Sequence, residues 1–352
     1  MPPQDLSFDV TEAVGSGESL SQAAWLFLPG DPTRATAVLV CLAGGTYDKR
    51  YWHLEVPGRR GYSFAEHLAD QGYLVVALDH LGTGGSSDPQ RSGSMGLRML
   101  AAGDAEAVAQ ISARLRDGTL VPGLPPLRLP VVGVGHSMGS CLTTMVAAQA
   151  RPYDAVALLG YGVQISNVQN DAGGDEDLAA RMNQSEAVFR QLNGLGPDDV
   201  SCVVPREQLR QLFHAPDVPG DVIAADDAAE SRVPVRAASE VITPGYVAEF
   251  AAAVDVPVFL ALGSHIDVSP DPYAEVANYR ASRDVTLYVV EGSAHCHNFS
   301  GGRIALYQQA RTAGSGEAWL AICPATPQLV QVGVKTVLDT LPYGEWKTHS
   351  RV

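Results

Sequence analysis

The chain has 352 residues, of which 24 are Lys or Arg and 39 are Asp or Glu, so its formal net charge is −15. Hydrophobic residues make up 46%, and the 35 Gly and 23 Pro follow no collagen-like period, which excludes disordered and fibrous proteins. The acidic balance disfavours phosphate backbones and anionic lipid headgroups, and no basic cluster offsets it. We therefore expect no nucleic acid partner and no membrane partner.

The location of the protein is predicted from its cysteines and its N-terminus. The N-terminus lacks the basic start and apolar stretch of a secretory signal, and no apolar run is long enough to span a bilayer. The five cysteines are widely spaced and odd in number, which favours free thiols in a reducing compartment. We expect a cytoplasmic protein, and the sequence does not indicate its oligomeric state.

Strand and helix patterns alternate along the chain. Residues 5–14 and 21–29 predict a hairpin around a turn at 15–19. Apolar, β-branched runs then predict buried strands, with amphipathic helices between them. The predicted strands lie at 36–45, 73–87 with its Gly-rich loop, 129–137, 154–162, 254–264 and 285–295, and the helices at 62–73, 103–116, 138–150 and 271–282. This order predicts an α/β fold, with a mainly parallel central sheet and helices on both faces.

The strand pattern stops between residues 163 and 253. This segment is polar and acidic and has helical stretches at 176–193, 206–215 and 245–254. We therefore expect a core of residues 1–162 and 254–352, with a helical cap or lid inserted over 163–253. The tail after residue 299 contains one predicted helix, at 329–341.

The most informative motif is Gly135-His136-Ser137-Met138-Gly139, which lies between a predicted strand and a predicted helix. In that context G-x-S-x-G is typical of a nucleophile elbow, a strained turn whose glycines allow the Ser hydroxyl to project from the backbone. The competing interpretation is a glycine-rich turn with an incidental serine.

On this motif, and on the order Ser137, Asp267, His295, the sequence resembles the α/β-hydrolase superfamily over roughly residues 20–163 and 254–300. The resemblance implies a catalytic triad in which Ser137 attacks, His295 is the general base and Asp267 orients the imidazole. Both partners follow predicted strands, at the carboxyl edge of the sheet where open α/β proteins place their sites.

Several neighbours compete with these two residues. His297 is the alternative base, and His265 is expected to be a satisfied structural histidine. Asp255 lies at the wrong end of its strand, whereas Asp271 is placed to cap a helix.

Metal binding and cofactors are not favoured. Only Cys296 would join His295 and His297 as a third ligand type, so we expect no metal, and we expect no cofactor. Cys141, four residues after Ser137, is expected to pack into the core.

An oxyanion hole needs two N–H donors. Met138, directly after the nucleophile, is expected to supply one of them. The other is expected from Ala43-Gly44-Gly45-Thr46, which replaces the His-Gly pair common in the superfamily. Gly45 and Thr46 both stay open, and by position we prefer Gly45; an ordinary glycine turn is the competing explanation.

Other residues are expected around this site. Gly44, Thr46, Tyr47, Trp52 and His136 are candidates for lining the pocket, with packing an equally good explanation for the aromatic residues. The sequence from Asp79 to Ser86 resembles the superfamily's D-x-x-G-x-G-x-S loop, in which Asp79 would fix the loop and the glycines would supply positive φ.

The predicted function is a serine hydrolase that cleaves a carboxylic ester or lactone of a small or medium-sized substrate through an acyl-enzyme. A serine at the elbow argues against haloalkane dehalogenases and epoxide hydrolases, which use Asp. C–C bond hydrolases, thioesterases, amidases, acyltransferases and cofactor-free lyases stay open, because they share the fold. The alternative from another class is a catalytically inactive binding protein. An acidic lid would favour neutral or cationic substrates over polyanions.

Overall fold

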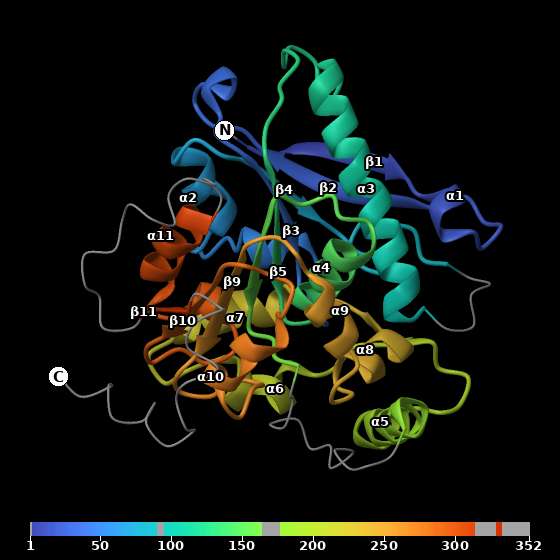
Figure 1. Ribbon diagram of the computed structural model, residues 1–352. Coiled ribbons are helices and arrows are strands. Elements are labelled where there is room, and N and C mark those ends of the chain that lie inside the picture. The colour runs from blue at the N-terminus through green and yellow to red at the C-terminus, as the bar shows by residue number, and fades with distance from the viewer. Residues whose placement is uncertain (1, 90–94, 164–176, 314–328, 333–352) are drawn as a thin grey trace.

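The structure is a computed structural model that describes residues 2–89, 95–163, 177–313 and 329–332. Its frame is a nine-stranded sheet (Figure 1). In spatial order the strands are β1 (Gln4–Asp9), β2 (Ser21–Phe27), β4 (Leu74–Leu78), β3 (Val38–Leu42), β5 (Val131–His136), β6 (Ala155–Leu159), β9 (Val258–Gly263), β10 (Val285–Val290) and β11 (Leu329–Val332). The strands from β4 to β10 are parallel, and β1, β2 and β11 are antiparallel to their neighbours. This confirms the predicted mainly parallel sheet.

The central strands are apolar throughout because both faces of the sheet are covered. In β3, Val38, Val40 and Leu42 join the core beneath α3 (Leu97–Asp117) and α4 (Met138–Gln149). Leu39 and Cys41 point the other way, into the core beneath α2 (Phe64–Asp70) and α11 (Arg303–Ala313). The period of two in a strand therefore divides the interior into two hydrophobic clusters.

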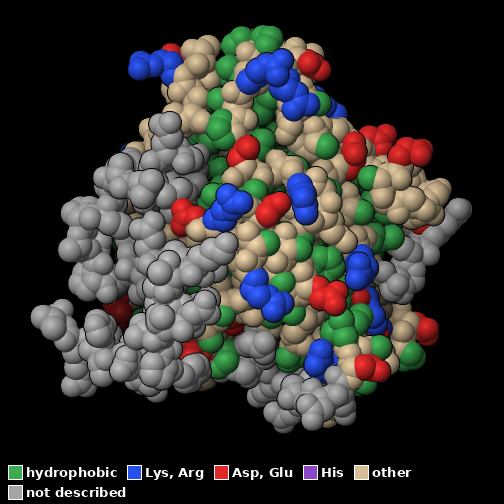
Figure 2. Space-filling model, viewed as in Figure 1, with side chains coloured by type: hydrophobic (Ala, Val, Ile, Leu, Met, Phe, Trp, Pro, Cys, Tyr) green, Lys and Arg blue, Asp and Glu red, His purple; other side chains and the backbone are tan. Residues whose placement is uncertain are grey.

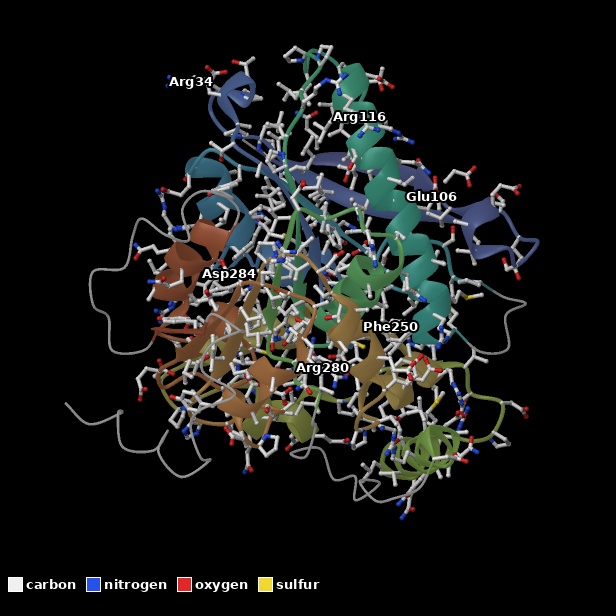
Figure 3. All side chains as sticks on the ribbon, in the orientation of Figure 1. Arg34, Glu106, Arg116, Phe250, Arg280 and Asp284 are labelled. Carbon is white, nitrogen blue, oxygen red and sulfur yellow. The ribbon has the colours of Figure 1, made fainter. Side chains whose placement is uncertain are left out.

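Helix α3 illustrates how one layer is anchored. Its Leu100, Val108 and Ile111 are buried on the sheet side, whereas Glu106 and Arg116 lie on the outer side (Figure 3). The helix ends because Gly118, at φ 69°, adopts a left-handed C-cap.

The segment between β6 and β9, called the inserted segment below, contains five helices and two short strands in its described part. These are α5 (Leu178–Asn193), β7 (Ser201–Cys202), α6 (Arg206–Phe213), α7 (Gly220–Ala228), β8 (Val233–Pro234), α8 (Val235–Val241) and α9 (Ala248–Ala253). Helices α5 and α6 lie at the lower edge of the view in Figure 1. Helix α8 packs on α3 and α5, and α9 packs on α4, so the end of this segment is joined to the helical layer of the sheet.

The N-terminal hairpin is confirmed, but its first strand is shorter than predicted. Strand β1 ends at Asp9, and α1 (Thr11–Val14) takes up the remainder of the predicted strand. The Asp9 carboxylate accepts a hydrogen bond from the Thr11 N–H at 2.9 Å, and Gly15 closes the turn at φ 66°. This local hydrogen bond and the left-handed Gly15 C-cap favour one helical turn over a longer strand.

The C-terminal predictions need two corrections. Residues 329–332 of the predicted helix form β11, which pairs with the outer edge of β10; the remainder of that helix lies outside the described residues. A strand edge offers unpaired N–H and C=O groups, and this pairing satisfies them. Helix α11 was not predicted, although Leu306, Tyr307 and Ala310 give it a buried side. The helix predicted at 271–282 is reduced to α10 (Pro272–Glu275) and the 3-10 turn η3 (Val276–Asn278).

The surface carries charges of both signs. On the face in Figure 2, Lys and Arg side chains are interspersed with Asp and Glu. No helix within the described ranges is both long and apolar enough to cross a bilayer.

Candidate active site

Ser137 stands at the junction of β5 and α4 in a strained conformation, with φ 53° and ψ −121°. The residues two positions before and two positions after it must be glycine for this turn to close. A Cβ added at Gly135 would lie 2.4 Å from the Ser140 Cα, and one at Gly139 would lie 2.0 Å from the Leu42 carbonyl oxygen. Both glycines of the motif are therefore required by close approach, and the strain is held at the one residue whose hydroxyl would react.

The loop after β3 meets the elbow. A Cβ at Gly44 would lie 2.9 Å from the Ser137 Cβ, so the two backbones are in close contact. The next residue, Gly45, lies beside Met138: a Cβ there would be 3.8 Å from the Met138 Sδ. The two positions expected to supply oxyanion N–H groups are thus adjacent to each other and to the serine.

Asp267 and His295 are brought together from the ends of β9 and β10. The His295 Nδ1 donates to the Asp267 Oδ1 at 2.8 Å, and both side chains are buried. The backbone N–H groups of Gly263 and Val268 also donate to the carboxylate, at 2.7 and 2.8 Å. With its Nδ1 proton bound to Asp267, the imidazole has its Nε2 lone pair available as a base.

A second imidazole shares the same carboxylate. The His297 Nε2 donates to the Asp267 Oδ2 at 2.9 Å, and His297 is fully buried. Sequence reasoning treated His297 as a rival of His295, but the structure places the two residues on different oxygens of one acid. Their spacing of two residues was the only available signal, and it did not distinguish competition from cooperation.

Asp267 is held ionised by these donors. Burial alone would raise the pKa of Asp267, but the hydrogen bonds and charges of His295 and His297 outweigh it and lower that pKa well below its usual range. The carboxylate is therefore available to stabilise an imidazolium at any pH near neutrality.

His136 holds the backbone of the predicted base, His295. Its Nε2 donates to the His295 carbonyl at 2.9 Å, and its ring stacks on Tyr51 with a centroid distance of 4.3 Å. Burial, followed by the nearby charges of His295 and His297, lowers the pKa of His136 well below its usual value. A neutral His136 therefore fixes the His295 backbone without adding charge to the site.

Comparison with known proteins shows the family and the fold of the chain. The sequence pattern of the serine aminopeptidase family, S33, matches residues 58–299. The chain belongs to this family of α/β hydrolases. Two solved structures share the fold: a soluble variant of monoglyceride lipase from Saccharomyces cerevisiae (13% identity, 88% of this chain and 93% of the lipase, TM-score 0.62) and a carboxyl esterase from Bacillus coagulans (17% identity, 88% and 97%, TM-score 0.59).

A relative in sequence is named for protein secretion and not for hydrolysis. The chain is 38% identical over 257 residues to the ESX-5 secretion-associated protein EspG5 of Mycobacterium marinum, covering 66% of this chain and 83% of the relative. The family membership supports hydrolase chemistry, whereas this relative's name describes a secretion system.

In this α/β hydrolase, the inserted segment lies directly on the histidine loop. The backbone N–H groups of His295 and Cys296 donate to the carbonyls of Leu212 and Phe213, both at 3.0 Å. The Phe213 ring lies 5.6 Å from the His295 ring, and His295 is only 2% exposed. The C-terminal end of α6 thus packs against His295 and helps to bury it.

The remaining aromatic candidates are buried. The Tyr47 hydroxyl donates to Asp226 at 3.1 Å and lies 3.2 Å from the Cys296 Sγ. Burial, followed by the Asp226 charge, raises the pKa of Tyr47 well above its usual value. Trp52 is fully buried and packs against Tyr51 and Phe64.

Of the other residues named from the sequence, Asp271 and Asp79 have structural roles and His265 does not. His265 is exposed, so the expectation of a satisfied structural histidine was wrong. The Asp271 side chain caps α10 through the Tyr273 and Ala274 N–H groups, as predicted. Asp79 fixes its loop as predicted, because its carboxylate accepts from the backbone N–H groups of Lys49 (2.7 Å) and Gly85 (2.8 Å).

The thiols of Cys141 and Cys296 are buried and unreactive. Cys141 packs into the core as expected, and burial raises its pKa to about 12. Burial also raises the pKa of Cys296 well above its usual value, so neither thiol ionises near neutral pH.

A surface cavity of about 570 Å³ lies between the Asp79 loop and the inserted segment. Its lining includes Trp25, Gly84 and Arg232 but not the Ser137, Asp267 and His295 side chains. No group of three metal-ligating side chains with suitable geometry occurs in the described part of the chain.

Proposed function

We propose that this protein is a serine hydrolase that cleaves a carboxylic ester or lactone of a small or medium-sized substrate. Ser137 attacks the carbonyl, His295 takes the hydroxyl proton and returns it to the leaving group, and Asp267 stabilises the imidazolium. The N–H groups of Met138 and Gly45 bind the oxyanion, and water then releases the acyl group. The net charge of −15 supports neutral or cationic substrates.

The observations that carry this proposal are the buried, hydrogen-bonded pair of Asp267 and His295 and the strained backbone of Ser137 at the end of β5. The 2.8 Å hydrogen bond fixes the tautomer needed for a base, and the φ of 53° at Ser137 is strain that an incidental surface serine would not need. Family membership adds hydrolase chemistry to this geometry.

The test is turnover by wild type and Ser137→Ala. Wild type should hydrolyse p-nitrophenyl acyl esters and a γ-lactone, and react at Ser137 with a fluorophosphonate. Ser137→Ala should lower kcat by about 10⁴-fold or more while leaving the melting temperature close to that of wild type. A p-nitroanilide of an amino acid distinguishes an amidase, and equal turnover by both proteins would refute the serine mechanism.

The second candidate is a hydrolase fold that acts as a binding protein without catalysis. Two observations favour it: the relative named as secretion-associated, and the position of α6 over a His295 that is 2% exposed. A folded wild type that neither turns over esters nor reacts with a fluorophosphonate at Ser137 would select this candidate.

A further inference from the structure

Thr46, directly after the Gly45 expected to bind the oxyanion, has an unusual backbone. Its φ is 69°, in the left-handed region that a β-branched residue disfavours. Such a conformation persists only where the surroundings hold it. The side chain and carbonyl of Thr46 therefore need partners that fix this turn.

Those partners come from the inserted segment. The Arg206 Nη2 donates to the Thr46 carbonyl at 2.8 Å, and the Arg206 Nη1 donates to the Thr46 hydroxyl. The Ser231 N–H donates to the same carbonyl at 2.9 Å. The turn is thus held from across the site, by residues 160 and more positions away in the sequence.

Arg206 is buried around this contact. It is 5% exposed, and its guanidinium stacks on the ring of Tyr47 at 3.9 Å from the centroid. Its Nε faces the buried Asp226 Oδ2 at 3.8 Å, and that carboxylate also accepts from the His214 Nε2 at 3.0 Å. A planar guanidinium can stack on a ring and donate two parallel hydrogen bonds at once, which a lysine cannot do.

We propose that Arg206 is a positioning residue for the oxyanion hole. Its guanidinium holds Thr46 in the left-handed conformation and so fixes the backbone from which Gly45 donates its N–H to the substrate oxygen. The inserted segment then completes the catalytic site rather than only covering it. This inference rests on the proposed serine hydrolase function.

A positioning role and a purely structural role of Arg206 predict different kinetics. A residue that only fastens the inserted segment would change stability and KM when removed. A residue that positions an oxyanion donor acts on the transition state, so its removal lowers kcat and weakens transition-state analogues in parallel.

The experiment compares Arg206→Met and Arg206→Lys with Arg210→Met. Arg210 lies one turn further along α6, and its ion pair with Asp227 is at the surface, with both side chains more than a third exposed. The readouts are kcat and KM for a p-nitrophenyl ester, the inhibition constant of phenylboronic acid and the melting temperature. We expect Arg206→Met to lower kcat by about 10- to 100-fold, with a similar loss of boronate affinity and a KM within a few-fold of wild type. Arg206→Lys should fall between, and Arg210→Met should match wild type.

A second variant keeps the inference testable if Arg206→Met folds poorly. Glycine adopts a φ of 69° without strain, so Thr46→Gly should reduce the kcat lost on replacing Arg206. Equal kcat in Arg206→Met and an active wild type would overturn the inference alone, as would a loss confined to KM. A wild type that turns over no ester overturns the proposed function and this inference with it.

Discussion

Two adjacent glycines allow the geometry around the nucleophile to be tested with one chemical change. Neither Gly44 nor Gly45 has a positive φ, so alanine is compatible with the backbone at both. A Cβ at Gly44 would lie 2.9 Å from the Ser137 Cβ and 3.0 Å from the His136 Nδ1. A Cβ at Gly45 would meet its nearest atom, in Val233, at 3.6 Å, an ordinary contact.

The magnitude follows from these distances. Carbon atoms in good contact lie roughly 3.5 Å apart or more, so Gly44→Ala must displace Ser137 or the loop by about half an ångström. Overpacking of this kind costs about 1–3 kcal/mol of stability, and a misplaced nucleophile loses up to about 100-fold in rate. Gly45→Ala keeps the N–H and has room, so we expect near wild-type rates from it.

The assay is the rate of fluorophosphonate labelling at Ser137 together with kcat for a p-nitrophenyl ester. Thermal melts of both variants establish that they are folded. We expect Gly44→Ala to be slow in both reactions and Gly45→Ala to be close to wild type. A Gly44→Ala variant that reacts like wild type, together with an impaired Gly45→Ala, would refute a steric clash at Gly44.

Two further predictions concern the histidines around Asp267. His297→Leu removes one donor to a buried carboxylate, a hydrogen bond worth about 1.5–3 kcal/mol, so we expect kcat to fall about 10-fold or more, whereas His297→Gln keeps a donor near the Nε2 position and should restore most of it. Equal kcat in the two variants would show that the hydrogen bond is not needed. Because the folded-state pKa of His136 lies below its unfolded value, the unfolded chain binds the extra proton, and stability is lost as pH falls below about 6.5, by at most about 1.4 kcal/mol per pH unit. The free energy of unfolding, measured with urea between pH ~7 and ~5, should change less with pH in His136→Gln than in wild type. An equal change with pH in the two proteins would contradict this role of His136.

Local sequence patterns were enough to predict the fold and to select the candidate catalytic residues. Strand β5, which ends at the elbow, and its sheet neighbours β3 and β6 are buried throughout, and a sheet covered on both faces leaves few other places for such runs. Asp267 and His295 each follow such a strand, so the parallel order alone places them at one edge. The predicted secondary structure was wrong at residues 11–14, where a local turn ends the strand. It was also wrong at residues 329–332, where the pairing partner, β10, is distant in the chain.

The supporting residues were beyond sequence reasoning for a physical reason. Arg206 and Thr46 are 160 positions apart, and nothing in a segment read as an acidic lid marks one arginine as buried. The strained φ of Thr46 is invisible in the sequence too, because threonine ordinarily avoids it. His297 was seen, but its role depends on which carboxylate oxygen it meets.

The two candidate functions make opposite demands on α6. For a hydrolase, a substrate must reach a His295 that is 2% exposed and has the Phe213 ring at the end of α6 5.6 Å from its own ring, so α6 would have to move. A binding protein needs no such movement, and the same contacts would simply stabilise a closed surface. Yet neither a buried Asp267 carboxylate bound by both His295 and His297 nor a strained Ser137 brings an advantage to a closed surface. Burying a carboxylate and straining a backbone both cost stability. The presence of both costs in one protein therefore favours the proposed catalysis over the binding role.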